Sequence, residues 1–170
     1  MTLRAAQGTD AAPLAALSIE VWLNTYLREG VSAFFADYAL ETFTPSHFNR
    51  VLAEPDETII VSQNTVGIDG YVRISRNRTA PVSGCGSVEI SSLYVQPRHH
   101  GRAIGQALLN AAIKHAKSLQ VKDIWLTTNA ENSPAIGFYL KNGFEKIGET
   151  TFDIQDQSYL NNVYRLMFSH

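Results

Sequence analysis

The apolar residues of this chain follow two spacings, one typical of amphipathic helices and one typical of strands. A spacing of three to four residues predicts helices at residues 10–30, 44–54, 101–119 and 132–142. Alternating or β-branched runs predict strands at residues 2–6, 58–62, 66–74, 87–95, 121–128, 144–152 and 159–168. The aromatic segment after Gly30, AFFADYALETF, is ambiguous between the two.

Capping residues mark several of these boundaries. Asp10, Thr44 and Asn132 are residue types that accept hydrogen bonds from the first turn of a helix. Proline follows closely after Thr44 and Asn132, as is common at the first helical positions. The pair Asn142-Gly143 is typical of a helix end.

The order of elements predicts a mixed sheet. Strand 87–95, helix 101–119 and strand 121–128 follow one another directly, which predicts a right-handed crossover between two parallel strands. The other strands are spaced as hairpins. We therefore expect an α/β fold (α+β by some schemes) with a mixed central sheet of about seven strands flanked by helices, in a single domain of residues 1–170.

The composition narrows the class of protein. The 170 residues are 45% hydrophobic and 18% charged, as in ordinary globular domains. A net charge of −2 argues against a nucleic-acid binder. The single cysteine, Cys85, excludes an internal disulfide and suits a reducing compartment. Because no signal peptide is recognisable and no apolar run approaches the ~18 residues of a membrane span, we expect a cytoplasmic protein without membrane contact.

The segment of residues 91–109, SSLYVQPRHHGRAIGQALL, predicts an anion site. A strand ends at Val95, a short turn closes at Gly101 and a helix follows. The first N–H groups of a helix have no internal partners, and a phosphate is their common ligand. The triphosphate loop pattern is absent from the sequence. Gly84 and Gly86 give only G-x-G before a strand, so the dinucleotide fingerprint fails.

A third phosphate loop fits. Arg98, Gly101 and Ala103 fill a pattern of Gln or Arg, two residues, Gly, one residue, then Gly or Ala. Taken alone, the loop is equally explained by a helix start whose small residues pack on the sheet. The flanking stretches EISSLYVQP and NAENSPAIGFYLKNGFE add two further ordered matches. Over residues 87–148, the chain resembles the GNAT superfamily of N-acetyltransferases.

The resemblance implies acetyl-CoA as donor, with no metal. It implies two splayed parallel strands whose free backbone groups pair with the pantetheine arm, while amides of residues 101–106 hold the pyrophosphate. The implied cofactor-binding residues are Leu93, Tyr94, Val95, Arg98, His100, Gly101, Arg102, Ala103, Ile104, Gly105, Gln106, Asn129, Asn132 and Tyr139. The arginines are alternatively part of a solvated loop, and Asn132 is alternatively a helix cap.

The resemblance also implies the chemistry: acetyl transfer to a primary amine of a small molecule or peptide, by direct attack through a tetrahedral intermediate. Tyr139 would protonate the departing thiolate, or else simply pack in the core. An alkylamine with a pKa of ~10.4 must lose a proton before attack. Glu89 would take that proton through water, or else be an exposed or salt-bridged strand residue. Strand alternation places Glu89, Ser91 and Leu93 on one face, barring a bulge.

The acceptor is left open by the sequence. Residues 22–45, 75–86 and 152–162 would select it, and the first segment supplies aromatic side chains from Trp22, Tyr26, Phe34, Phe35, Tyr38 and Phe43. Carboxylates that would suit a cationic acceptor, or are simply solvated, are Glu20, Glu29, Asp37, Glu41, Asp153 and Asp156.

Other interpretations also stay open. The same scaffold could use another acyl-CoA or an alcohol acceptor, or the chain could be a non-catalytic acetyl-CoA sensor. The adjacent His99 and His100 are a poor metal pair, and Cys85 is better explained as a loop thiol than as a nucleophile. A homodimer through the closing strands is possible.

Overall fold

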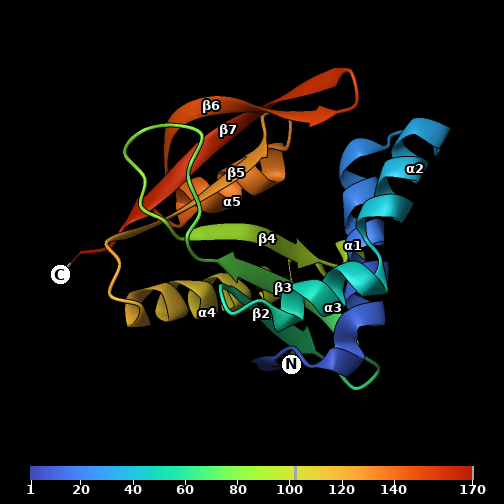
Figure 1. Cartoon of the computed structure of the whole chain (residues 1–170), viewed down its shortest axis with the longest axis horizontal. Coiled ribbons are helices and arrows are strands. Elements are labelled where there is room, and N and C mark those ends of the chain that lie inside the picture. The colour runs from blue at the N-terminus through green and yellow to red at the C-terminus, as the bar shows by residue number, and fades with distance from the viewer. Residues whose placement is uncertain (102, 170) are drawn as a thin grey trace. The chain divides into compact units, whose positions relative to one another are not determined.

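The computed structural model describes residues 1–101 and 103–169, and the elements are labelled in Figure 1. Seven strands form one sheet in the order β1-β2-β3-β4-β5-β7-β6. The strands are β1 (Thr2–Ala5), β2 (Glu57–Gln63), β3 (Ile68–Ser75), β4 (Glu89–Val95), β5 (Asp123–Asn129), β6 (Glu145–Ile154) and β7 (Gln157–Met167). The α-helices are α1 (Ala11–Tyr26), α2 (Ala33–Thr42), α3 (Pro45–Ala53), α4 (Ile104–Ser118) and α5 (Ser133–Lys141). Two short 3-10 helices are η1 (Gly8–Asp10) and η2 (Pro97–His99).

The sheet is mixed, which confirms the predicted fold class. Strand β1 runs antiparallel to β2, and β7 runs antiparallel to both β5 and β6. Strand β4 runs parallel to β5, with Glu89 opposite Trp125. The intervening α4 is therefore the predicted crossover helix.

The structure corrects one sequence expectation about helices and resolves one ambiguity. The first helix ends at Tyr26 rather than near Gly30, because the chain turns to an extended conformation at Leu27. The ambiguous aromatic segment is helix α2, and the Ser32 side chain caps it by accepting from the Phe35 N–H. The predicted caps are confirmed at Thr44, which accepts from the N–H of His47, and at Asn132.

The chain divides into two compact units, each described by itself. The first comprises Met1–Ile74 and Ser92–Ala112, and the second comprises Ser75–Ser91 and Ile113–His170. The boundaries fall inside β3, β4 and α4. The single domain of residues 1–170 stays a prediction.

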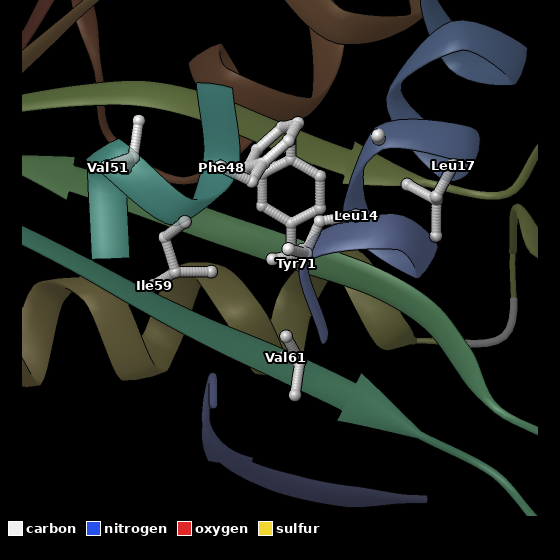
Figure 2. Packing of buried hydrophobic residues seen from close by; sticks show 9 residues of the cluster. Leu14, Leu17, Phe48, Val51, Ile59, Val61 and Tyr71 are labelled. Carbon is white, nitrogen blue, oxygen red and sulfur yellow. The ribbon is translucent and has the colours of Figure 1, made fainter. Parts of the chain in front are cut away.

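The first unit has its core between the helices α1 and α3 and the strands β2 and β3. Figure 2 shows Tyr71 of β3 lying against Phe48 of α3. The centroids of the two rings are 6.1 Å apart. Leu14, Val61 and Tyr71 are 0–1% exposed. The other buried members of the cluster are Ala11, Ala15, Leu17, Val51 and Ile59. This core holds β3 in place next to the strand that carries the predicted donor site.

The second unit anchors residues 84–86 of the long loop. The Gly86 N–H donates to both carboxylate oxygens of Asp123, at 3.1 and 2.9 Å. The Trp125 indole donates to the Gly86 carbonyl at 3.0 Å, and Arg165 donates to the carbonyl of Gly84. Three side chains from β5 and β7 thus fix part of the polar, Gly-rich loop of residues 75–86.

Candidate active site

The turn before α4 has the backbone geometry of an anion cradle. Gly101 has a φ of +86° and Ala103 a φ of +62°, both in the left-handed region. The Ala107 N–H donates to the Ala103 carbonyl at 3.0 Å, so the helical bonds begin there. The N–H groups of Ile104, Gly105 and Gln106 therefore lie in the first turn, where helix geometry gives them no internal partner. Left-handed turns that bring N–H groups together bind anions, and the helix dipole adds positive potential.

Free space adjoins this turn. A Cβ added to Gly101 would meet no described atom within 4 Å. Arg98 is exposed. The Gln106 side chain donates to Asn110 at 3.0 Å, so its contribution to a ligand would come from its backbone. Arg102, the other predicted phosphate contact, lies outside the described residues.

His100 is turned back toward the end of the strand. Its Nε2 lies 3.1 Å from the Val95 carbonyl oxygen, and its own backbone N–H donates to Pro97 at 3.2 Å. The imidazole therefore contacts the last residue of β4, and the predicted bond to a phosphate stays a prediction.

The end of β4 is held close to β3 and α4. A Cβ added to Gly70 would lie 2.9 Å from the Tyr94 carbonyl oxygen and 3.2 Å from Leu108 Cδ1. The N–H of Gln96 donates to the Asp69 carbonyl at 2.9 Å. Residues 93–95, predicted to pair with the donor's arm, are therefore positioned by a glycine that sequence inspection did not single out.

Contacts between β3 and β4 are made within each unit. In the first unit, the Tyr71 ring lies 5.5 Å from that of Tyr94. In the second unit, the hydroxyl of Ser75 contacts that of Ser91. The expectation that Glu89, Ser91 and Leu93 share one face of the strand, barring a bulge, stays a prediction.

In the second unit, the two predicted asparagines shape the turn after β5. The Asn129 Oδ1 accepts from the Glu131 N–H at 2.8 Å, and the Asn132 Oδ1 accepts from the Ala135 N–H at 3.3 Å. Both carbonyl oxygens are thus engaged by the backbone, and the carboxamide Nδ2 of Asn132 is the part that would reach a ligand. The capping role is confirmed, and the cofactor role stays a prediction.

Tyr139 is buried on α5 in an aromatic group. Its ring lies 5.3 Å from that of Phe138 and 5.5 Å from that of Phe144, and the residue is 8% exposed. Burial raises the pKa of the Tyr139 phenol well above its ordinary value. The hydroxyl therefore keeps its proton at neutral pH, as a proton donor must.

Glu89 lies on the second unit's part of β4. Its carboxylate is 3.9 Å from the Arg78 guanidinium, and the two side chains are 19% and 43% exposed. The salt-bridged alternative is therefore realised, which leaves the role of base as a prediction.

The aromatic side chains of α1 and α2 pack on one another. The Trp22 ring lies 4.7 Å from Tyr38 and 4.6 Å from Tyr26, and Tyr26 stacks at 6.0 Å on Phe35. These rings therefore form a local core in the first unit. Glu29, Asp37, Glu41, Asp153 and Asp156 are exposed, as solvated carboxylates are. Glu20 differs, because it accepts a hydrogen bond from Gln96 at 3.2 Å.

Cys85 lies between the two anchored glycines. Burial and the nearby Asp123 raise the pKa of its thiol, while Arg165 acts in the opposite direction. A raised pKa keeps the thiol protonated and makes it a poor nucleophile. The described residues contain no group of three metal-ligating side chains and no helix long and apolar enough to cross a membrane.

Comparison with known proteins agrees with this geometry. The model of the acetyltransferase (GNAT) family matches residues 18–144. An uncharacterized N-acetyltransferase of Mycobacterium bovis is 27% identical over 144 residues, 85% of this chain and 88% of that protein. The N-alpha-acetyltransferase RimI of Mycobacterium tuberculosis is 30% identical over 109 residues, 64% of this chain and 65% of that protein.

A solved structure shares the fold along the whole chain. The PaiA N-acetyltransferase from Thermoplasma acidophilum, in complex with coenzyme A, superposes with a TM-score of 0.76 at 18% identity, covering 99% of this chain and 100% of that one. The strand order, the parallel β4–β5 pair and the left-handed turn before α4 are thus found in a chain with the sequence of this family. The chain therefore belongs to the acetyltransferase (GNAT) family and is an acyltransferase of the N-acetyltransferase class.

Proposed function

We propose that this enzyme transfers the acetyl group of acetyl-CoA to a primary amine of a small molecule or peptide by direct attack. The observation that carries the donor assignment is the pair of left-handed residues, Gly101 and Ala103, directly before the first turn of α4. A diphosphate carries the charge that this turn attracts, and the space beside Gly101 admits it.

The residues described above fit the donor in two further ways. In the first unit, the backbone of residues 93–95 would pair with the amides of the pantetheine arm. In the second unit, the Asn132 Nδ2 would donate to a bound ligand. When bound, acetyl-CoA supplies an activated thioester. A backbone N–H near Val95 would stabilise negative charge on the thioester oxygen, because a fixed dipole needs no reorganisation during the reaction.

Tyr139 would act as the general acid. Its pKa is raised by burial, so the hydroxyl is protonated over the range in which a thiolate departs. General acid catalysis contributes about 10²–10⁴-fold to a rate. Glu89 would accept the amine proton through a water.

The acceptor would be an amine, in keeping with the names of two proteins that this chain resembles. One is the N-alpha-acetyltransferase RimI, and one is a ribosomal-protein-alanine N-acetyltransferase from Brucella melitensis that shares the fold at a TM-score of 0.71. A small-molecule amine is equally compatible with the residues described here. The acceptor is therefore proposed as a primary amine without further restriction.

The test is release of CoA thiol from acetyl-CoA in the presence of spermidine, glucosamine or a peptide with a free N-terminal alanine. We expect amine-dependent release with at least one acceptor, and acetylated amine by mass spectrometry. In Tyr139→Phe, turnover should fall by about 10²-fold or more while CoA affinity is preserved. Tight CoA binding without release with any amine would favour a sensor, and unchanged Tyr139→Phe turnover would exclude the acid role.

A further inference from the structure

Two side chains of β5 in the second unit bind both backbone polar groups of Gly86, shortly before Glu89. The Asp123 carboxylate accepts from the Gly86 N–H, with N···O distances of 3.1 and 2.9 Å to its two oxygens. The Trp125 indole N–H donates to the Gly86 carbonyl at 3.0 Å. Asp123 and Trp125 are 5% and 3% exposed, so both side chains are shielded from competing water. Side chains of β5 therefore make at Gly86 the two hydrogen bonds that backbone groups make in an ordinary ladder.

The backbone of β5 holds the residues that follow Gly86. The Trp125 N–H donates to the Val88 carbonyl at 3.2 Å. Trp125 is also the Cα partner of Glu89 in the parallel β4–β5 pair. Trp125 thus binds this segment through its indole at Gly86 and through its backbone at Val88, directly before Glu89.

The loop residue that faces Glu89 is tied to the same segment. The Arg78 N–H donates to the Ser87 carbonyl at 2.9 Å, and the Arg78 guanidinium lies 3.9 Å from the Glu89 carboxylate. Arg165 of β7 donates to the carbonyl of Gly84 at the other end of the segment. The charged side chains that hold or face residues 84–89 in these contacts are those of Arg78, Asp123 and Arg165.

We propose that Asp123 and Trp125 are positioning residues for Glu89. By holding Gly86 and Val88 against β5, they keep the Glu89 carboxylate where it takes the amine proton through a water. This inference rests on the proposed function, in which Glu89 is the base. A general base must lie within hydrogen-bond reach of its proton or of one bridging water, and a misplacement of about 1 Å can cost about 10²-fold in rate.

The pH profile of kcat/KM for the amine separates positioning from plain stabilisation. It is measured with the acetylated member of the panel of spermidine, glucosamine and the alanine peptide. A base is needed most where the amine is protonated and least above the pKa of the amine. Asp123→Ala should therefore lower kcat/KM about 10-fold or more below that pKa and only about twofold above it. Trp125→Phe, which removes the indole N–H, should show the same pattern and is a second variant should Asp123→Ala fail to fold.

Two further variants complete this comparison. Asp123→Asn keeps an acceptor oxygen for the Gly86 N–H and should recover most of the rate. Asp10→Ala is the matched control, because Asp10 is 6% exposed and also accepts from a backbone N–H, that of Gln7 at 2.7 Å. It should lose stability without a pH-dependent loss of rate.

A double-mutant cycle tests whether Asp123 acts through Glu89. Added to Glu89→Gln, the Asp123→Ala change should alter kcat/KM by less than about twofold, because the residue that it positions no longer acts as a base. A crystal structure of Asp123→Ala gives a measurement that does not depend on turnover. We expect the Glu89 carboxylate to be displaced by about 1 Å or more, with Tyr139 in its original place.

Several outcomes would overturn the inference. These are a loss of rate that is equal at every pH, the same loss in Asp10→Ala, full additivity in the cycle, and a Glu89 carboxylate that does not move in Asp123→Ala. An unaltered pH profile in Glu89→Gln would contradict the base assigned in the proposed function, and absence of thiol release by the unaltered enzyme would contradict that function as a whole. In either of these cases the crystal structure of Asp123→Ala decides whether the hydrogen bonds at Gly86 position Glu89.

Discussion

Replacing Gly70 with alanine should disturb both the stability of the first unit and its hold on the donor. The added Cβ would lie 2.9 Å from the Tyr94 carbonyl oxygen, 3.2 Å from Leu108 and 3.3 Å from Ile104. The nearest of these atoms is backbone, and the other two belong to side chains that are 0% and 5% exposed, so none can move aside freely. Overpacking of this kind costs about 1–3 kcal/mol, against about 0.5–1 kcal/mol gained when alanine replaces glycine in a strand.

The net expectation for Gly70→Ala is a loss of about 1–2 kcal/mol in the free energy of unfolding, measured by urea titration. The displaced end of β4 and start of α4 should also raise the KM for acetyl-CoA. Gly67→Ala is the control, because it makes the same change in the same hairpin and its Cβ would meet nothing within 4 Å. If Gly70→Ala is as stable as Gly67→Ala and binds acetyl-CoA equally well, the close approach of β3 to Tyr94 does not position the strand.

Three further predictions concern other parts of the molecule. Gly86→Ala should lower the free energy of unfolding in urea by about 1–3 kcal/mol, because the added Cβ would collide with the Asp123 carboxylate and displace it from the N–H of residue 86. Stability equal to that of the unaltered protein would contradict the anchoring role of Asp123. Ala103→Val should be about 1–3 kcal/mol less stable than Ala103→Gly and bind CoA more weakly in calorimetry, since a β-branched residue at φ +62° is strained. The Arg4 guanidinium lowers the pKa of Asp10 through its hydrogen bonds. The stability that Asp10 contributes is therefore present above its ordinary pKa of 3.8 and is lost as the pH falls through the lowered value. Asp10→Asn should weaken this acid dependence in unfolding curves recorded from pH 2 to 6.

The donor turn is the part of the site that sequence could predict. Its geometry is built from consecutive residues, so a glycine and an alanine two positions apart before a helical pattern are enough to indicate it. The cap at Asn132 was predictable for the same reason. The location of Tyr139 on a helix with a buried face could likewise be inferred, although its raised pKa depends on rings such as Phe144 that fold against it.

The features that sequence could not predict join segments far apart in the chain. Gly70 is one glycine among several until the Tyr94 carbonyl is placed beside it. The salt bridge between Arg78 and Glu89 crosses a polar loop that carries no pairing signal.

The proposed contacts of the donor and of the acceptor differ in kind. This difference explains why the sequence indicates the donor and leaves the acceptor open. The donor contacts proposed here are mainly backbone groups, and short patterns of small residues are sufficient to expose them. The acceptor would be selected by side chains, and the fold sets their positions through contacts such as the stacking of Trp22 on Tyr38 at 4.7 Å, which short sequence patterns do not encode. Specificity for the acceptor should accordingly be sought in contacts that the fold creates between separate segments of the chain.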